Sequence, residues 1–248
     1  MKLPAVCLIA ALASGPAWAA DPAVSLAGVQ ITVGSSASAG DMSSAVKILL
    51  GLTVLSLAPA ILMSMTAFVR IVIVLSMLRH ALGMQDTPPN TVVISLALFL
   101  TFFTMSSTLN QINTEGLQPF MAGKLGPEAA VQQAVHPLRE FMVRQTREQD
   151  LALMVELAKA EQPATVDDIS MVQLIPAFML SELRAAFQIG FVIFLPFLLV
   201  DLIVSSALMA LGMMMVPPAS ISLPLKILLF VLIDGWSLVV RALLGTFA

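Results

Sequence analysis

The sequence has few charged residues, few histidines, no tyrosine and almost no cysteine. Only 11% of its 248 residues are charged, and it contains no tyrosine, two histidines and one cysteine. Because a typical soluble domain is about 25% charged, an ordinary soluble enzyme is excluded. A net charge of −3 supplies no basic surface for a phosphate backbone, so no nucleic-acid partner is expected. With 58% hydrophobic residues and a mean hydropathy of +0.96, the composition is that of a membrane protein.

The sequence also lacks the motifs of common enzymes. His80 and His136 belong to no paired metal-ligand spacing, and no G-x-S-x-G elbow or G-x-x-x-x-G-K-[ST] phosphate loop occurs. The sequence therefore predicts neither a metal nor a cofactor. One catalytic alternative stays open, because Asp201 and Asp234 each lie in an apolar segment and could share a proton as an intramembrane aspartyl pair.

Residues 1–19 have the form of a secretory signal peptide. Lys2 precedes an apolar run from Leu3 to Ala13, and an A-x-A sequence ends at Ala19. The apolar run is shorter than the ~20 residues that a membrane span needs. Cleavage after Ala19 would remove Cys7 and leave the mature chain without a disulfide, with its N-terminus outside the cytoplasm.

Charge divides the rest of the chain into segments. Fourteen of the 27 Asp, Glu, Lys and Arg residues lie between Asn113 and Ser170, with long apolar runs on either side. Helical spacing without strand alternation predicts an all-α fold, with about four long apolar segments and a helical polar insert. The predicted segments are a flexible leader at 20–45, an apolar helical hairpin at 46–112, the polar insert at 113–170 on the extracytoplasmic side, and a second apolar hairpin with a Met-rich loop at 171–248.

Several ionisable residues lie in or beside the apolar helices. A charge in hydrocarbon costs at least ~2.5–3.5 kcal/mol on insertion scales, so such groups usually pair or face a polar interior. We expect partners on other helices or other subunits, the alternative being that Arg and Lys extend from helix ends to the headgroups. The residues are Glu182, Arg184, Asp201, Lys226, Asp234 and Arg241.

Three adjacent methionines, Met213, Met214 and Met215, lie between Gly212 and Pro217. Methionine side chains repack at low cost, and they often fill the core at a helix end. Repeated around a symmetric ring, the same side chains would form an apolar constriction that excludes water and ions.

Four stretches resemble the FliP family of flagellar biosynthetic proteins: Phe68–Asn90, Pro176–Phe191, Gly212–Pro218, and Pro224–Lys226 with Ile233–Trp236. The resemblance implies a non-enzymatic pore subunit of the type III export gate in the flagellar basal body of the bacterial inner membrane. It implies a helical ring of about five copies with the partners FliQ and FliR and other export-apparatus membrane proteins. Unfolded flagellar proteins would pass through this channel.

The resemblance also implies roles for particular residues. Met213, Met214 and Met215 match a methionine gasket of the pore, and Glu182 and Lys226 match positions that pair between neighbouring subunits. Two alternatives remain: the equivalent subunit of a virulence injectisome, and a small-solute or proton-coupled transporter that uses Asp201 and Asp234 as carriers.

Overall fold

The computed structural model describes residues 23–26, 29–32, 39–159, 165, 168–213 and 215–247. The predicted signal peptide with its cleavage site at Ala19, and Met214 of the methionine triplet, lie outside the described residues. The chain divides into two compact units, Met1–Leu57 and Ala58–Ala248.

The first unit contains a small hairpin and most of one helix. Strands β1 (Ala23–Leu26) and β2 (Val29–Thr32) pair antiparallel, with Ala23 opposite Thr32 and Leu26 opposite Val29. Helix α1 spans Ala39–Ser64. The all-α prediction missed the hairpin, whose β-branched residues alternate with polar ones over too few positions to stand out in a Ser-, Ala- and Gly-rich segment.

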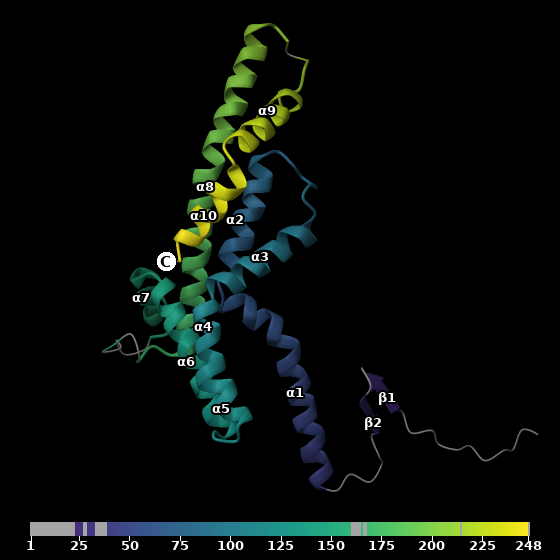
Figure 1. Cartoon of the computed structure of the whole chain (residues 1–248), viewed down its shortest axis with the longest axis vertical. Helices are drawn as coiled ribbons and strands as arrows, with labels where there is room; N and C mark the ends of the chain where they lie inside the picture. Colours follow the sequence, from purple (N-terminus) through teal and green to yellow (C-terminus); the bar gives the residue numbers. More distant parts are fainter. Residues whose placement is uncertain are drawn as a thin grey trace, which may run out of the picture. The chain divides into compact units, whose positions relative to one another are not determined.

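Every described element of the second unit is helical, as predicted (Figure 1). Helices α3, α4, the π-helical turn η1 and α5 follow one another almost without interruption. Helices α6 and α7 form the rest of the polar insert, and α8 is the longest element. The elements are α2 (Phe68–Ala81), α3 (Asn90–Thr104), α4 (Ser106–Gln111), η1 (Ile112–Leu117), α5 (Gln118–Met121), α6 (Pro127–Gln145), α7 (Glu148–Leu157), α8 (Met171–Ala210), α9 (Ala219–Leu232) and α10 (Gly235–Gly245).

The predicted apolar segments are present, but most of them are broken. Among the described residues α8 is long and apolar enough to cross a membrane, and up to three spans result if each bent pair counts as one. Asn90–Thr104 and Ser106–Met121 meet at 64°, and Ala219–Leu232 and Gly235–Gly245 meet at 68°. The first apolar run is interrupted between Ser64 and Phe68. Hydropathy detects the apolar residues but not these bends.

Helix α8 ends at a glycine. Gly212 has φ +70°, a conformation that glycine adopts without the steric cost of a Cβ. The Gly212 amide donates to the Met209 carbonyl at 3.1 Å and the Met213 amide to the Leu208 carbonyl at 3.0 Å. These bonds satisfy carbonyls that a helix end otherwise leaves unpaired, so the methionine triplet begins where α8 stops.

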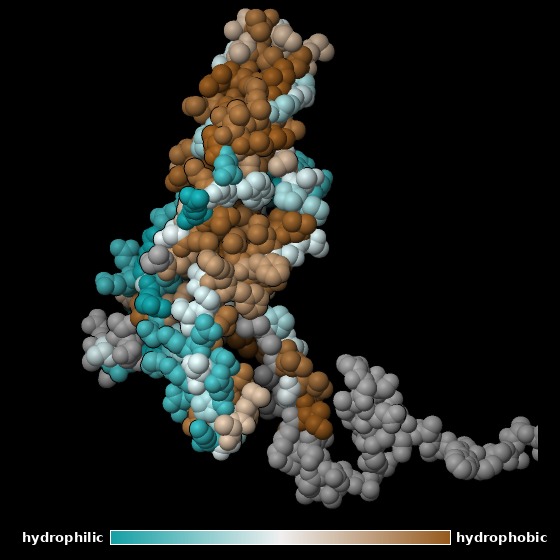
Figure 2. Space-filling view, in the orientation of Figure 1, coloured by the Kyte–Doolittle hydropathy of each residue, from teal (hydrophilic) through white to brown (hydrophobic). Residues whose placement is uncertain are grey.

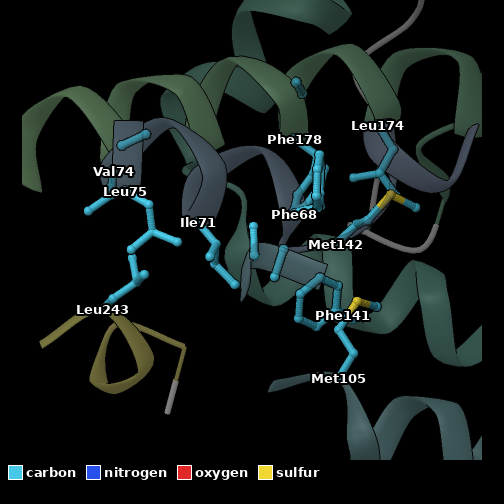
Figure 3. Packing of buried hydrophobic residues seen from close by; sticks show 14 of the residues in the cluster. Phe68, Ile71, Val74, Leu75, Met105, Phe141, Met142, Leu174, Phe178 and Leu243 are labelled. Atoms are coloured by element: carbon cyan, nitrogen blue, oxygen red, sulfur yellow. The ribbon is translucent and has the colours of Figure 1, made fainter. Parts of the chain in front are cut away.

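The core lies where α2 and the insert pack on the first half of α8 (Figure 3). The rings of Phe141 and Phe178 meet edge to face, with centroids 6.0 Å apart. The predicted polar insert is therefore packed onto α8, the first helix of the predicted second apolar hairpin. Buried members of this cluster include Phe68, Ile71, Val74, Met105, Phe141, Met142, Leu151, Leu174, Phe178 and Leu243.

A large apolar surface remains uncovered in the single chain. Figure 2 shows hydrophobic residues over α8 and α9 at one end and hydrophilic residues over the insert. Exposed apolar area of this extent marks contact with lipid or with other protein chains. Exposed side chains include Phe99, Phe102 and Phe103 of α3, Phe187, Phe191, Leu199 and Ile203 of α8, and Leu228, Val231 and Leu232 of α9.

Candidate functional site

The most deeply buried ion pair among the described residues joins Arg70 of α2 to Glu182 of α8, whose side chains are 4% and 0% exposed. Arg70 Nε donates to Glu182 Oε2 at 2.9 Å, and Arg70 Nη2 donates to Glu182 Oε1. The planar guanidinium thus meets both carboxylate oxygens, the arrangement that best offsets the desolvation of a buried pair.

Arg70 has acceptors for all five of its N–H groups. Besides Glu182, Nη2 donates to Gln145 Oε1 at 3.2 Å, and Nη1 donates to the Thr246 carbonyl at 3.3 Å and to Thr246 Oγ1 at 3.1 Å. The guanidinium carbon also lies 3.9 Å from the centre of the Phe247 ring, a cation–π geometry. One side chain therefore joins α2, α6, α8 and the residues after α10.

A second polar cluster fastens the insert to α8. Asp150 of α7 is buried, and its carboxylate accepts a hydrogen bond of 2.6 Å from Ser181 Oγ and lies 3.2 Å from Arg184 Nη2. The Arg147 amide donates to Ser181 Oγ at 3.0 Å, and Arg147 Nη2 donates to Gln188 Oε1 at 2.6 Å. Because a buried carboxylate left unpaired is costly, these contacts fix the corner between α6 and α7 on α8.

The third charge pair joins the second half of α8 to α9. Lys226 Nζ lies 2.6 Å from Asp201 Oδ2 and donates to the Ala81 carbonyl at 3.2 Å. The Lys226 side chain is 7% exposed, whereas that of Asp201 is 40% exposed. Both residues line a cavity of about 590 Å³, and His80, Ser205 and Ser222 also line it.

The remaining predicted charges lie at the surface of the single chain. Asp234 and Arg241 are exposed, and Arg184 is exposed while contacting Asp150. Asp234 begins α10 after the bend, with φ 49° and ψ 53° and no side-chain capping bond. The carboxylate of Asp201 binds Lys226, and no contact joins it to Asp234 in the described chain. This arrangement gives no support to an aspartyl catalytic pair.

Glu182 and Lys226, predicted to pair between subunits, each have a different partner within the chain: Arg70 for Glu182 and Asp201 for Lys226. Neither Arg70 nor Asp150 was predicted from the sequence to be a partner of these charges. Arg70 could have been found, since it is the one charge between Lys47 and Arg79 in the first apolar run. Asp150 lies among many charges of the insert, and nothing in the sequence singles it out.

Two residues of the methionine triplet are described. Met213 and Met215 are both exposed, Met215 to 98%, and they lie in the turn between α8 and α9. No metal-binding group of three His, Cys, Asp or Glu side chains occurs among the described residues.

Comparison with known proteins identifies a family. The FliP family model matches residues 51–243. The flagellar biosynthetic protein FliP of Bacillus subtilis is 54% identical over 88% of this chain and 98% of its own length. The FliP proteins of Pectobacterium carotovorum and Caulobacter vibrioides are 53% and 46% identical, covering 82% and 91% of this chain and 78% and 85% of their own lengths. The chain therefore belongs to the FliP family.

Proposed function

We propose that this chain is a pore-forming subunit of the flagellar type III protein export gate. In this role it passes unfolded flagellar proteins across the bacterial inner membrane at the basal body. Membership of the FliP family makes it a structural component of the flagellar export apparatus and not an enzyme. Because the similar proteins are named as flagellar, they favour the flagellar gate over a virulence injectisome.

The bends in the apolar helices carry the argument for an assembly. Two helix pairs that are apolar enough to cross a membrane bend by 64° and 68° at breaks in the middle. Non-helical backbone at membrane depth is tolerated only where protein buries it or where it lines a water-filled cavity. Neighbouring subunits would supply that cover.

The length of α8 supports the same conclusion. Its 40 residues span roughly 60 Å at 1.5 Å per residue, twice the ~30 Å of a bilayer's hydrocarbon core. The first half of α8 is covered by α2 and the insert, while the second half exposes apolar side chains such as Phe191, Leu199 and Ile203. A ring of about five copies with FliQ and FliR would bury this second half.

Within that ring we assign the pore seal to Met213, Met214 and Met215, and we place the mature N-terminus and the insert on the periplasmic side. If the signal peptide is removed, the mature chain has no cysteine. A single cysteine at Lys124 in the insert, which is exposed, should then react with a membrane-impermeant maleimide in intact spheroplasts. Protection from the reagent until the cells are lysed would contradict this topology.

Complementation tests the function. In a flagellated bacterium deleted for its own FliP, expression of this chain with its FliQ and FliR should restore export of flagellar proteins into the medium. A membrane-inserted chain, expressed with those partners, that restores no export would contradict the proposal. Asp201→Asn and Asp234→Asn test the transporter alternative. If that alternative holds, each change should abolish transport while the complex still assembles.

A further inference from the structure

Helix α10 is attached at both ends. At its start, Asp234 has φ 49° and α9 and α10 meet at 68°. A left-handed conformation is sparsely populated for residues with a Cβ, although Asp tolerates it better than most. Next to it, a Cβ on Gly235 would lie 2.2 Å from the Phe230 ring, so the chain passes tightly against that ring. Asp234 and Gly235 therefore form a sharp turn between α9 and α10.

The other end of α10 is attached to Arg70. Thr246 accepts two hydrogen bonds from Arg70 Nη1, at 3.1 and 3.3 Å, and the Phe247 ring lies 3.9 Å from the guanidinium carbon. Thr246 is exposed and Phe247 half-buried. The rest of the described chain therefore leaves one side of this contact uncovered.

Between its two ends, α10 is incompletely packed. Val239 and Leu243 are buried, but the neighbouring face with Leu238 and Ala242 borders a cavity of about 440 Å³ whose opposite wall includes Val192 of α8. The cavity is open to the surface on one side, so it is a groove between α10 and α8. A gap of this size forfeits contacts that would otherwise hold the middle of α10 on α8.

We propose that α10 is a hinged strap: it swings about Asp234 and Gly235 when Thr246 and Phe247 leave Arg70, and the groove over α8 opens. Release of Thr246 and Phe247 does not leave the buried Arg70 charge unpaired, because Arg70 keeps both hydrogen bonds to Glu182 and its hydrogen bond to Gln145. Water replaces Thr246 at Nη1, so opening exchanges hydrogen bonds instead of leaving a donor unpaired. The strap therefore opens while the α2–α8 core stays closed.

Hydrogen–deuterium exchange of the mature chain, purified in detergent and then in its complex, tests the strap. Thr246→Val with Phe247→Ala weakens the attachment without touching the Arg70–Glu182 pair. Amides of residues 235–247 should then exchange about tenfold faster or more, while those of residues 68–81 and 171–186 keep the wild-type rate. Arg241→Gln, an exposed change on the same helix, is the matched control for the chain alone and should leave every rate there unchanged.

Ala242→Leu, introduced into the weakened variant, provides an independent test. The larger side chain at the edge of the cavity should increase the contact between α10 and α8 and so slow the amide exchange of α10. Wild-type rates in α10 of the weakened variant would overturn the proposal. Equal acceleration of α10, α2 and α8 would also overturn it, because that pattern means general destabilisation and not a swinging strap.

Discussion

Arg70 and Glu182 lie 112 positions apart in the chain and meet in the core as a buried, two-point ion pair. The pair joins α2 to α8 along the contact that organises the second unit. Removal of one partner leaves the other charge buried without compensation, which costs about 3–5 kcal/mol in measured cases.

Glu182→Leu alone should therefore lower the free energy of unfolding by about 3–5 kcal/mol, measured by denaturant titration of the purified chain in mixed micelles. Arg70→Met combined with Glu182→Leu should recover most of that loss, because no unpaired charge remains. The control is Lys124→Gln, a change at an exposed position of the insert, which should cost no more than about 0.5 kcal/mol. A double variant less stable than the single one would refute the explanation by unpaired charge.

The approach of α2 to α8 depends on Gly190. A Cβ there would lie 2.3 Å from Met77 Sδ and 3.2 Å from Met77 Cβ. Gly190→Ala should destabilise the chain by about 1–3 kcal/mol through overpacking, and Met77→Ala in the same chain should relieve much of that cost. Gly51→Ala, where a Cβ meets nothing within 4 Å, is the matched control. Equal thermal stability of the two alanine variants would show that the helices do not meet as described.

Lys226 should couple to different carboxylates in the single chain and in the assembly. A double-mutant cycle of Lys226→Met with Asp201→Asn in the monomer should give a coupling of about 0.5–3 kcal/mol, since the two side chains are 2.6 Å apart. The cycle of Lys226→Met with Glu182→Gln should give none in the monomer and a measurable coupling only in the complex. If the complex shows no such coupling, the predicted inter-subunit pair is wrong.

The backbone at Asp234 should reveal its left-handed conformation. Asp234→Gly and Asp234→Ala both remove the carboxylate, but glycine accepts φ 49° without steric cost. The glycine variant should be more stable than the alanine variant by about 1 kcal/mol, as seen in their melting temperatures. The reverse order would mean that the residue leaves this conformation in solution.

The methionine triplet should seal the assembled pore. Replacing Met213, Met214 and Met215 together by alanine removes flexible apolar side chains, so the complex should assemble yet conduct ions in planar bilayers. Three exposed methionines elsewhere, at positions 63, 121 and 209, provide a matched control that should stay non-conducting. If the triple alanine variant at 213–215 assembles and does not conduct ions, these methionines do not seal the pore.

The sequence predicted element types and charge locations better than it predicted partners. Apolar runs and the charged insert are visible as composition, and the mostly helical fold followed from them. The bend at Met105 has no signal in the sequence, because no proline or glycine lies near it. The bend at Asp234 is marked only by the turn dipeptide Asp234-Gly235, inside an otherwise apolar run. Hydropathy averages over a window, so it reads two short helices at 68° as one span.

Charge partners could not be read from spacing because they come from distant segments. The sequence showed that Glu182 and Asp201 need counter-charges, yet the choice among Arg70, Arg184 and Lys226 depends on how α2 and α9 lie against α8. Resemblance singled out Glu182 and Lys226 as paired positions, and within the chain each has another partner.

Native mass spectrometry of the mature chain coexpressed with FliQ and FliR, and released in mild detergent, tests the central claim most directly. We expect a discrete complex with about five copies of this chain, because the bent apolar helices and the second half of α8 need neighbouring subunits. A chain that stays monomeric or dimeric in the presence of both partners would contradict the pore and leave a small-solute transporter as the better description.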